Sequence, residues 1–97
     1  MSILTIVASI TAKEGKAAIV KAELEKLMKA SPSDEGCLTY KLHRDIDNPD
    51  HFLFYENWSS NEHFNKHMEQ PHIAEYVKAT EGLLEQFKMY KMVQVES

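Results

Sequence analysis

Side chains that can do chemistry are concentrated in one segment of the chain, from Tyr55 to Tyr76. It holds the only tryptophan, Trp58, and three of the five histidines. The unperturbed pKa of histidine lies near neutrality, so a positioned imidazole can accept or release a proton at physiological pH. Aromatic side chains beside it can form a dry wall and bind a flat ring. The segment therefore predicts a pocket in which a histidine moves a proton on a small molecule.

One strand face and two histidines supply the candidate residues of this pocket. Alternate residues of a strand share a face, which places Glu56 with Trp58 at the strand end. Glu56 can orient a histidine there or anchor a hydroxyl group. We predict catalytic roles for His67 and His72, and substrate binding by Trp58, Phe54, Glu56 and Tyr76.

Four of these six residues also have a purely structural interpretation. A tryptophan at a strand end is usually a core aromatic, and Glu56 can bond the backbone at that point. His67 shares a helix face with Phe64 and can simply pack against it. His72 follows Pro71 and can simply occupy a helix start. The residue pattern alone leaves both interpretations open.

The remaining histidines and the single cysteine give weaker signals. His63 and His67 have the i, i+4 spacing of a helical metal site, but no cysteine or evident third ligand accompanies them, so we predict no metal. His43 and His51 flank a hairpin turn and are expected to be solvated. Cys37 excludes an intramolecular disulfide and is typical of a small buried side chain in a reducing cytosol.

Apolar periodicity predicts the elements that must position these residues. Alternating β-branched and aromatic residues predict strands over residues 3–11, 37–44, 51–58 and 87–95. Apolar residues at helical spacing predict an amphipathic helix from about 17 to 31, a short helix from about 60 to 68, and a third from 71 to about 85. Ser59 and Glu62 have the spacing of a capping box, and Pro71 suits a first helical turn.

The order of these elements predicts one α+β domain over residues 1–97. With right-handed crossovers it gives the ferredoxin-like plan, a four-stranded antiparallel sheet of order 4-1-3-2 with the helices on one face. The first, third and fourth strands carry apolar residues on both faces, and leaving each large one in water forgoes roughly 1.5–3 kcal/mol. We therefore predict a homodimer in which two sheets pack face to face.

Composition excludes several classes of protein. The 97 residues carry 11 basic and 15 acidic side chains, a formal net charge of -4, and no basic run that could follow a phosphate backbone. Nucleic acid is therefore not an expected partner. The apolar start, Ile3 to Ile10, lacks a basic lead-in and a cleavage site and is too short to span a bilayer. We expect a cytoplasmic protein without a membrane segment.

Three short motifs and one isolated histidine carry a resemblance to a known family. They are Glu35-Gly36-Cys37-x-x-Tyr40, Tyr55-Glu56-x-Trp58-x-Ser60, His67, and Pro71-His72-x-x-x-Tyr76. Together they resemble the antibiotic biosynthesis monooxygenase domain family, most closely its small quinol-monooxygenase-like members. The resemblance implies a dimeric α/β barrel that oxidises a hydroquinone-like or phenolic substrate with molecular oxygen, using no metal, flavin or haem.

Two branches of that family fit this chain less well. Members that degrade haem place a histidine where this chain has Tyr76 and Val77, so haem is not an expected cofactor. Members that oxidise polyketides have an asparagine at the position of Phe54, and the nearby Asn57 falls on the opposite strand face. The polar part of the polyketide-oxidising site therefore does not simply carry over to this chain.

The function predicted from the sequence is a cofactor-independent monooxygenase that oxidises a small quinol or polyphenol. An ionised hydroquinone reduces oxygen more readily than the neutral phenol does, so the protein needs a base and a dry pocket. Two alternatives remain open. One is an isomerase or detoxifying enzyme for a small carbonyl metabolite, in which His67 or His72 moves a proton and oxygen is irrelevant. The other is a ligand-binding dimer without turnover.

Overall fold

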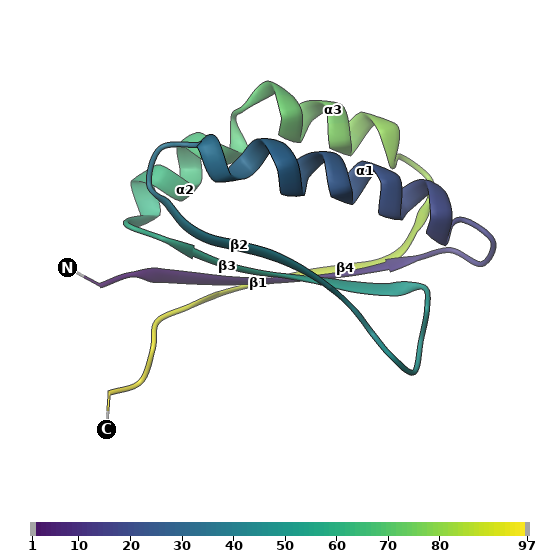
Figure 1. Ribbon diagram of the computed structural model, residues 1–97, viewed down its shortest axis with the longest axis horizontal. Coiled ribbons are helices and arrows are strands. Elements are labelled where there is room, and N and C mark those ends of the chain that lie inside the picture. Colours follow the sequence, from purple (N-terminus) through teal and green to yellow (C-terminus); the bar gives the residue numbers. More distant parts are fainter. Residues whose placement is uncertain (1, 97) are drawn as a thin grey trace.

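The computed structural model describes residues 2–96 as a sheet with helices along one side (Figure 1). The elements follow the predicted order: β1 (Leu4–Ala12), α1 (Ala17–Ala30), the 3₁₀ turn η1 (Ser31–Ser33), β2 (Cys37–Arg44), β3 (His51–Trp58), α2 (Asn61–Met68), α3 (Pro71–Ala79) and β4 (Leu84–Met92). The strands β2 and β3 begin and end at the predicted residues. Within the described part of the chain, no helix is long and apolar enough to cross a membrane.

All four strands pair antiparallel in one sheet of order β2-β3-β1-β4. This is the predicted order counted from the other edge, and it confirms the α+β, ferredoxin-like plan. In the central strand β1, Ala8 lies opposite Phe54 of β3 and Met89 of β4. The helices all lie on one side of the sheet, and its other side is bare (Figure 1). Glu56 and Trp58 share the buried parity of Phe54, so they face the helices.

The covered face of the sheet holds the apolar core. Alternate β1 side chains from Ile6 onward are buried there, and α1 packs Val20, Leu24 and Leu27 against them. The other parity of β1 is only half-buried, and Ile3 is 51% exposed. Within one chain the helices cover one face only, so burial of the other face would require the predicted partner sheet.

The helix α2 begins one residue later than its predicted capping box. Ser60 is the cap, and its Oγ accepts a hydrogen bond from the His63 N–H at 3.1 Å. Ser59 remains attached to the sheet, where its N–H donates to the Gly36 carbonyl at 2.9 Å. This backbone bond holds Ser59 outside the helix and passes the capping role to the next hydroxyl.

The end of α3 and the start of β4 also differ from the prediction. A turn closed by the Leu83 N–H and the Thr80 carbonyl, at 2.9 Å, ends the helix at Ala79 and returns the chain to the sheet. Leu84 consequently pairs with Ala12 in β4 rather than extending the buried stripe of the helix. The prediction of a helix to about residue 85 was therefore wrong for Leu84, which lies in a strand.

The bare face carries an ordered polar group around His51. Its Nδ1 donates to Asp45 Oδ2 at 2.9 Å, and its Nε2 accepts from Ser9 Oγ at 2.7 Å. The bond from His51 holds the pKa of Asp45 below its ordinary value. The prediction of a solvated His51 was wrong, because this half-buried ring ties the end of the β2–β3 hairpin to β1.

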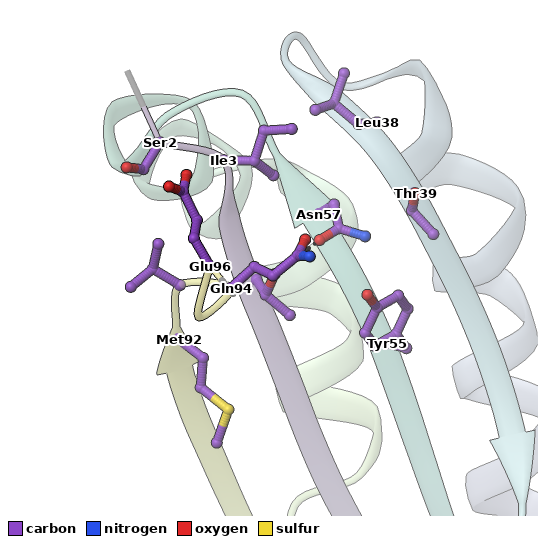
Figure 2. A pocket seen from close by; sticks show the side chains of 11 residues that line it. Ser2, Ile3, Leu38, Thr39, Tyr55, Asn57, Met92, Gln94 and Glu96 are labelled. Atoms are coloured by element: carbon purple, nitrogen blue, oxygen red, sulfur yellow. Dashed lines mark hydrogen bonds between the residues drawn. The ribbon is translucent and has the colours of Figure 1, made fainter.

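The bare face is also hollowed near the start of β1 and the end of β4. Figure 2 shows this hollow, of about 700 Å³, with Leu38 of β2, Tyr55 and Asn57 of β3 and Met92 of β4 around it. No histidine lines it, and Glu96 is the only charged side chain among its described lining residues. The larger hollow therefore lacks the histidine that we predicted as the base.

Candidate functional site

A smaller cavity, of about 160 Å³, lies between the covered face of the sheet and the helices. Most of its wall is apolar, with contributions from β1, β3, α1, α2 and α3. Exposed side chains of Val77 in α3 and of Phe87 and Met89 in β4 line it as well and form its solvent side. Four side chains in its wall can carry a transferable proton, namely Tyr40, Glu56, His67 and Tyr76.

Asp34 joins the two candidate histidines. Its Oδ2 accepts hydrogen bonds from His67 Nδ1 at 2.7 Å and from His72 Nε2 at 2.8 Å. Three segments meet in this cluster, because Asp34 follows η1, His67 lies in the last turn of α2 and His72 lies in the first turn of α3. A carboxylate only accepts, so His67 Nδ1 carries a hydrogen and its Nε2 is left as the proton acceptor.

Trp58 fixes the plane of the His67 ring. Trp58 is fully buried, and the two ring centroids lie 4.4 Å apart with 34° between the planes. Trp58 Nε1 donates to Glu56 Oε1 at 2.9 Å. Tyr40 packs edge-on, with its ring centroid 5.6 Å from that of His67. Packing thus sets the orientation of the imidazole, while Asp34 sets its tautomer.

Burial shifts the proton affinities of the cavity side chains. It raises the pKa of Glu56 to about 7, against the opposing effect of the hydrogen bond from Trp58. Burial lowers the pKa of His67, and the hydrogen bond and charge of Asp34 only partly oppose this. His67 is therefore neutral at pH 7 and free to accept a proton, while Glu56 exchanges its proton near neutrality.

The two cavity tyrosines remain protonated. Burial raises the pKa of Tyr76 to about 12, and it raises the pKa of Tyr40 further. The Tyr76 hydroxyl is buried without a hydrogen-bond partner among the described residues. Because buried polar groups are nearly always paired, this unpaired hydroxyl is an exception beside the cavity.

The structure brings four of the six predicted site residues to one cavity. These four are Phe54, Glu56, His67 and Tyr76. Trp58 lies behind the wall and supports it through its contacts with His67 and Glu56. His72 does not line the cavity and is connected to it through Asp34. Trp58 and His72 therefore do not line the cavity themselves. Trp58 contacts His67 and Glu56, and His72 is connected to His67 through Asp34.

The sequence-based prediction missed Asp34 and Tyr40. Asp34 lies between the first predicted helix and the strand predicted over residues 37–44, and its partner His67 is 33 positions away. A contact at that separation cannot be read from local spacing. Tyr40 was named in a family motif but not in the predicted site, although its alternation in β2 gives it the buried parity that Phe54 has in β3. The ring centroids of Tyr40 and Phe54 lie 4.6 Å apart.

Two residues that the sequence analysis assigned no catalytic role lie outside the cavity. The Nδ1 of His63 lies 2.7 Å from Ser60 Oγ, whereas the Nδ1 of His67 bonds Asp34. Burial raises the pKa of the Cys37 thiol to about 11, so it is protonated at neutral pH and a poor nucleophile.

Comparison with known proteins gives one family and several close folds. The model of the antibiotic biosynthesis monooxygenase family matches residues 3–79. The chain is 29% identical to PA3566 of Pseudomonas aeruginosa, covering 99% of this chain and 97% of the other, with a TM-score of 0.95. It is 28% identical to SO0527 of Shewanella oneidensis, covering 96% and 91%, with a TM-score of 0.91.

Two further similar proteins give no information on the reaction or the substrate. A crystal structure of an antibiotic biosynthesis monooxygenase is 24% identical, covers 96% of this chain and 99% of the other, and has a TM-score of 0.90, which supports the fold. The protein sll1783 of Synechocystis is 25% identical over 97 residues. The chain spans 66% of the length of that relative. None of these names specifies a substrate.

Proposed function

The chain belongs to the antibiotic biosynthesis monooxygenase family, and from that premise we propose that it oxidises a small quinol or polyphenol with molecular oxygen and without a bound cofactor. Family membership supports monooxygenase activity in general. The observation that carries the finer proposal is the Asp34–His67 pair at the wall of an apolar cavity, with its bond of 2.7 Å. It supplies an oriented base where an aromatic ring can be shielded from water.

His67 Nε2 is the proposed catalytic base. It takes the proton of one phenolic hydroxyl, while Asp34 stabilises the imidazolium that forms. The proton is moved without a metal, and the resulting anion is the electron donor to oxygen. His72 acts through Asp34, so we assign it a positioning role rather than direct contact with substrate.

Glu56 and Tyr76 are the proposed partners of the other substrate hydroxyl. Both line the same cavity, and the Tyr76 hydroxyl has no partner of its own among the described residues. Phe54 and Tyr40 offer apolar ring contacts. Ligand cavities usually measure about 300–1,000 Å³, and an apolar cavity of about 150 Å³ holds benzene in another protein. A volume of about 160 Å³ thus favours a substrate of one or two rings.

The proposed reaction balances without an external reductant. A naphthoquinol and one oxygen molecule give a hydroxynaphthoquinone and one water molecule. One oxygen atom forms a bond to a ring carbon, and the other leaves as water with two hydrogens. All four electrons come from the substrate, two on oxidation of the quinol and two on oxidation of the ring carbon. The proton accepted by His67 returns with the water.

Metal-stripped protein is expected to consume oxygen with a reduced naphthoquinone faster than the quinol autoxidises. The substitutions His67→Ala and His67→Gln should each reduce kcat by roughly 10²–10⁴-fold, because they remove the base. An oxygen electrode measures the rate, and mass spectrometry after reaction under ¹⁸O₂ should find one labelled atom in the product. The matched control is His63→Ala, the same change one helical turn earlier and outside the cavity.

Four outcomes contradict this proposal. A folded His67 variant with the parent rate removes the base from the mechanism. Hydrogen peroxide with an unlabelled quinone identifies simple quinol oxidation. Product formation under strict anaerobiosis indicates proton transfer on a carbonyl compound instead, and a ligand that emerges unchanged indicates a binding protein.

The bare face of the sheet supports a second element of the proposal, a homodimer. Its apolar side chains include Tyr55, Tyr90 and Met92, each more than two-fifths exposed at 41%, 42% and 48%. The molecule measures 42 × 33 × 18 Å, so one flat face contributes much of its surface. A stable interface needs about 800 Å² from each partner. A second sheet packed on this face supplies that area and also covers the hollow beside Tyr55 (Figure 2).

The substitution Tyr90→Glu is expected to convert the dimer to a monomer, because it places a charge opposite Val7 on this face. Sedimentation velocity at micromolar concentration measures the mass. Ile46→Glu is the matched control, since Ile46 is 96% exposed in the hairpin turn. Wild-type protein that sediments as a monomer, or a Tyr90 variant that remains dimeric, is incompatible with this interface.

A further inference from the structure

The cluster of Asp34, His67 and His72 has the composition of a metal-binding site. Its three ligand atoms, one carboxylate oxygen and two imidazole nitrogens, lie within 4.8 Å of one another. They come from three separate segments, so the fold and not a local motif assembles them. The sequence pointed to His63 and His67 as a helical pair. The structure instead gives His67 two other potential co-ligands.

We propose that this cluster binds a Zn²⁺ ion through Asp34 Oδ2, His67 Nδ1 and His72 Nε2, and that the ion switches off the base of the cavity. Three protein ligands of nitrogen and oxygen, with a fourth position left for water, match the donor set of open zinc sites. Imidazole and carboxylate are ligands that zinc accepts, and no thiolate is required. Binding itself does not depend on the proposed function, whereas inhibition rests on it.

Small movements convert the hydrogen-bonded cluster into a ligand set. The two nitrogen-to-oxygen distances are 2.7 and 2.8 Å. With zinc-to-ligand bonds of about 2.0–2.2 Å, tetrahedral geometry separates such atoms by about 3.4 Å, so these two pairs open by about 0.6–0.7 Å, and the two nitrogens, which lie within 4.8 Å of each other, settle at the same separation. His72 is the most exposed of the three, with 21% of its side chain accessible against 2% for His67. The ion therefore has an approach from the start of α3.

Metal binding changes the tautomer of His67. In the metal-free protein Asp34 holds the hydrogen on Nδ1 and leaves Nε2 free to accept. Zinc coordinates a nitrogen that has lost its hydrogen, so a neutral His67 bound through Nδ1 carries its hydrogen on Nε2. The nitrogen that serves the cavity is then already protonated. A zinc ion bound at Nδ1 thus removes the proton acceptor at Nε2 without entering the cavity.

Titration of the chelator-treated protein with ZnCl₂ tests the binding directly. Isothermal titration calorimetry should give one ion per chain. Loss of an outer-shell partner of a metal costs 10–100-fold in affinity, so loss of a ligand in Asp34→Asn or His72→Ala should cost about 100-fold or more. His63→Ala should bind as the parent does. Circular dichroism establishes whether each variant is folded. If His72→Ala does not fold, His72→Gln is measured in its place.

Two further measurements distinguish the site from nonspecific binding. In ¹⁵N-edited spectra of the histidine rings, one equivalent of Zn²⁺ should move the His67 hydrogen from Nδ1 to Nε2. In the oxygen assay it should abolish turnover, and chelation should restore it. Absence of stoichiometric binding, or binding that persists in the Asp34 and His72 variants, overturns the site. Binding and a tautomer change in a protein without quinol turnover uphold the site and instead count against the proposed reaction.

Discussion

Replacing Gly36 with alanine is expected to destabilise the protein by about 3 kcal/mol or more, which lowers the melting temperature of a domain this size by roughly 12 °C or more. Two costs add. Gly36 has a φ of 83°, in the left-handed region, where a residue with a Cβ pays about 1–2 kcal/mol. A methyl group there would also overlap Cβ and Cγ of His63 and lie 2.7 Å from its Cδ2.

His63 cannot relieve this overlap by changing its rotamer. Its Cβ is fixed by the backbone of α2, and its Nδ1 lies 2.7 Å from Ser60 Oγ and 3.0 Å from Ser59 Oγ. Either α2 or the loop before β2 must move. That loop is held by the bond from the Ser59 N–H to the Gly36 carbonyl. Because Asp34 lies in the same loop, the movement also disturbs the carboxylate that orients His67.

The matched control for Gly36→Ala is Gly15→Ala. Gly15 has a nearly equal φ of 79°, but a Cβ there meets nothing within 4 Å. It should therefore cost only the backbone term of about 1–2 kcal/mol. Urea unfolding of both variants separates the two costs. Equal midpoints for the two variants would show that α2 accommodates the methyl group without strain.

Strand parity explains how much of the fold and the site could be predicted from the sequence. The strands β2 and β3 were located correctly because alternation of apolar residues and a strong turn signal between them define both ends. The same alternation placed Glu56 on the face of Trp58, and the structure joins them by a hydrogen bond of 2.9 Å. A pattern with period two reports directly which side chains share a pocket wall.

The parts of the site that escaped prediction depend on tertiary contacts. Asp34 sits in a polar loop whose composition predicts a turn and nothing else, and only the packing of α2 and α3 brings two histidines to it. His72 and His67 were both predicted as catalytic residues, but the position of His72 in its helix gave no indication that Asp34 connects the two rings. Backbone competition also shifted the cap of α2, because Ser59 bonds the sheet rather than the helix. The spacing of residues along the sequence does not show which distant residues bond each other in the fold.

The substitution Glu56→Gln is expected to stabilise the protein at pH 8 by on the order of 3 kcal/mol and to have little effect at pH 4. Burial raises the pKa of Glu56 from 4.5 to about 7, and each unit of difference between the folded and unfolded states is worth about 1.4 kcal/mol. The glutamine amide is neutral at all pH values. Its oxygen can still accept from Trp58 Nε1, so the substitution removes the buried charge and keeps the hydrogen bond.

The sign follows from which state binds the proton more tightly. Below pH 4.5 Glu56 is protonated in both states and costs nothing. Between pH 4.5 and 7 the unfolded chain releases the proton while the folded protein keeps it, so the stability of the parent falls as the pH rises and then levels off. Urea unfolding of parent and variant from pH 4 to 8 should give curves that diverge across this interval. A difference that is constant with pH would show that Glu56 has an ordinary pKa.

Function opposes this gain in stability. Glu56 lines the cavity, and a carboxyl group that exchanges its proton near neutrality can take a proton from the second substrate hydroxyl, which an amide cannot do. Glu56→Gln should therefore raise the melting temperature at pH 8 while lowering kcat in the oxygen assay. Glu62→Gln is the matched control, because this exposed residue in the first turn of α2 lies outside the cavity. A variant that is more stable and equally active would restrict Glu56 to holding Trp58.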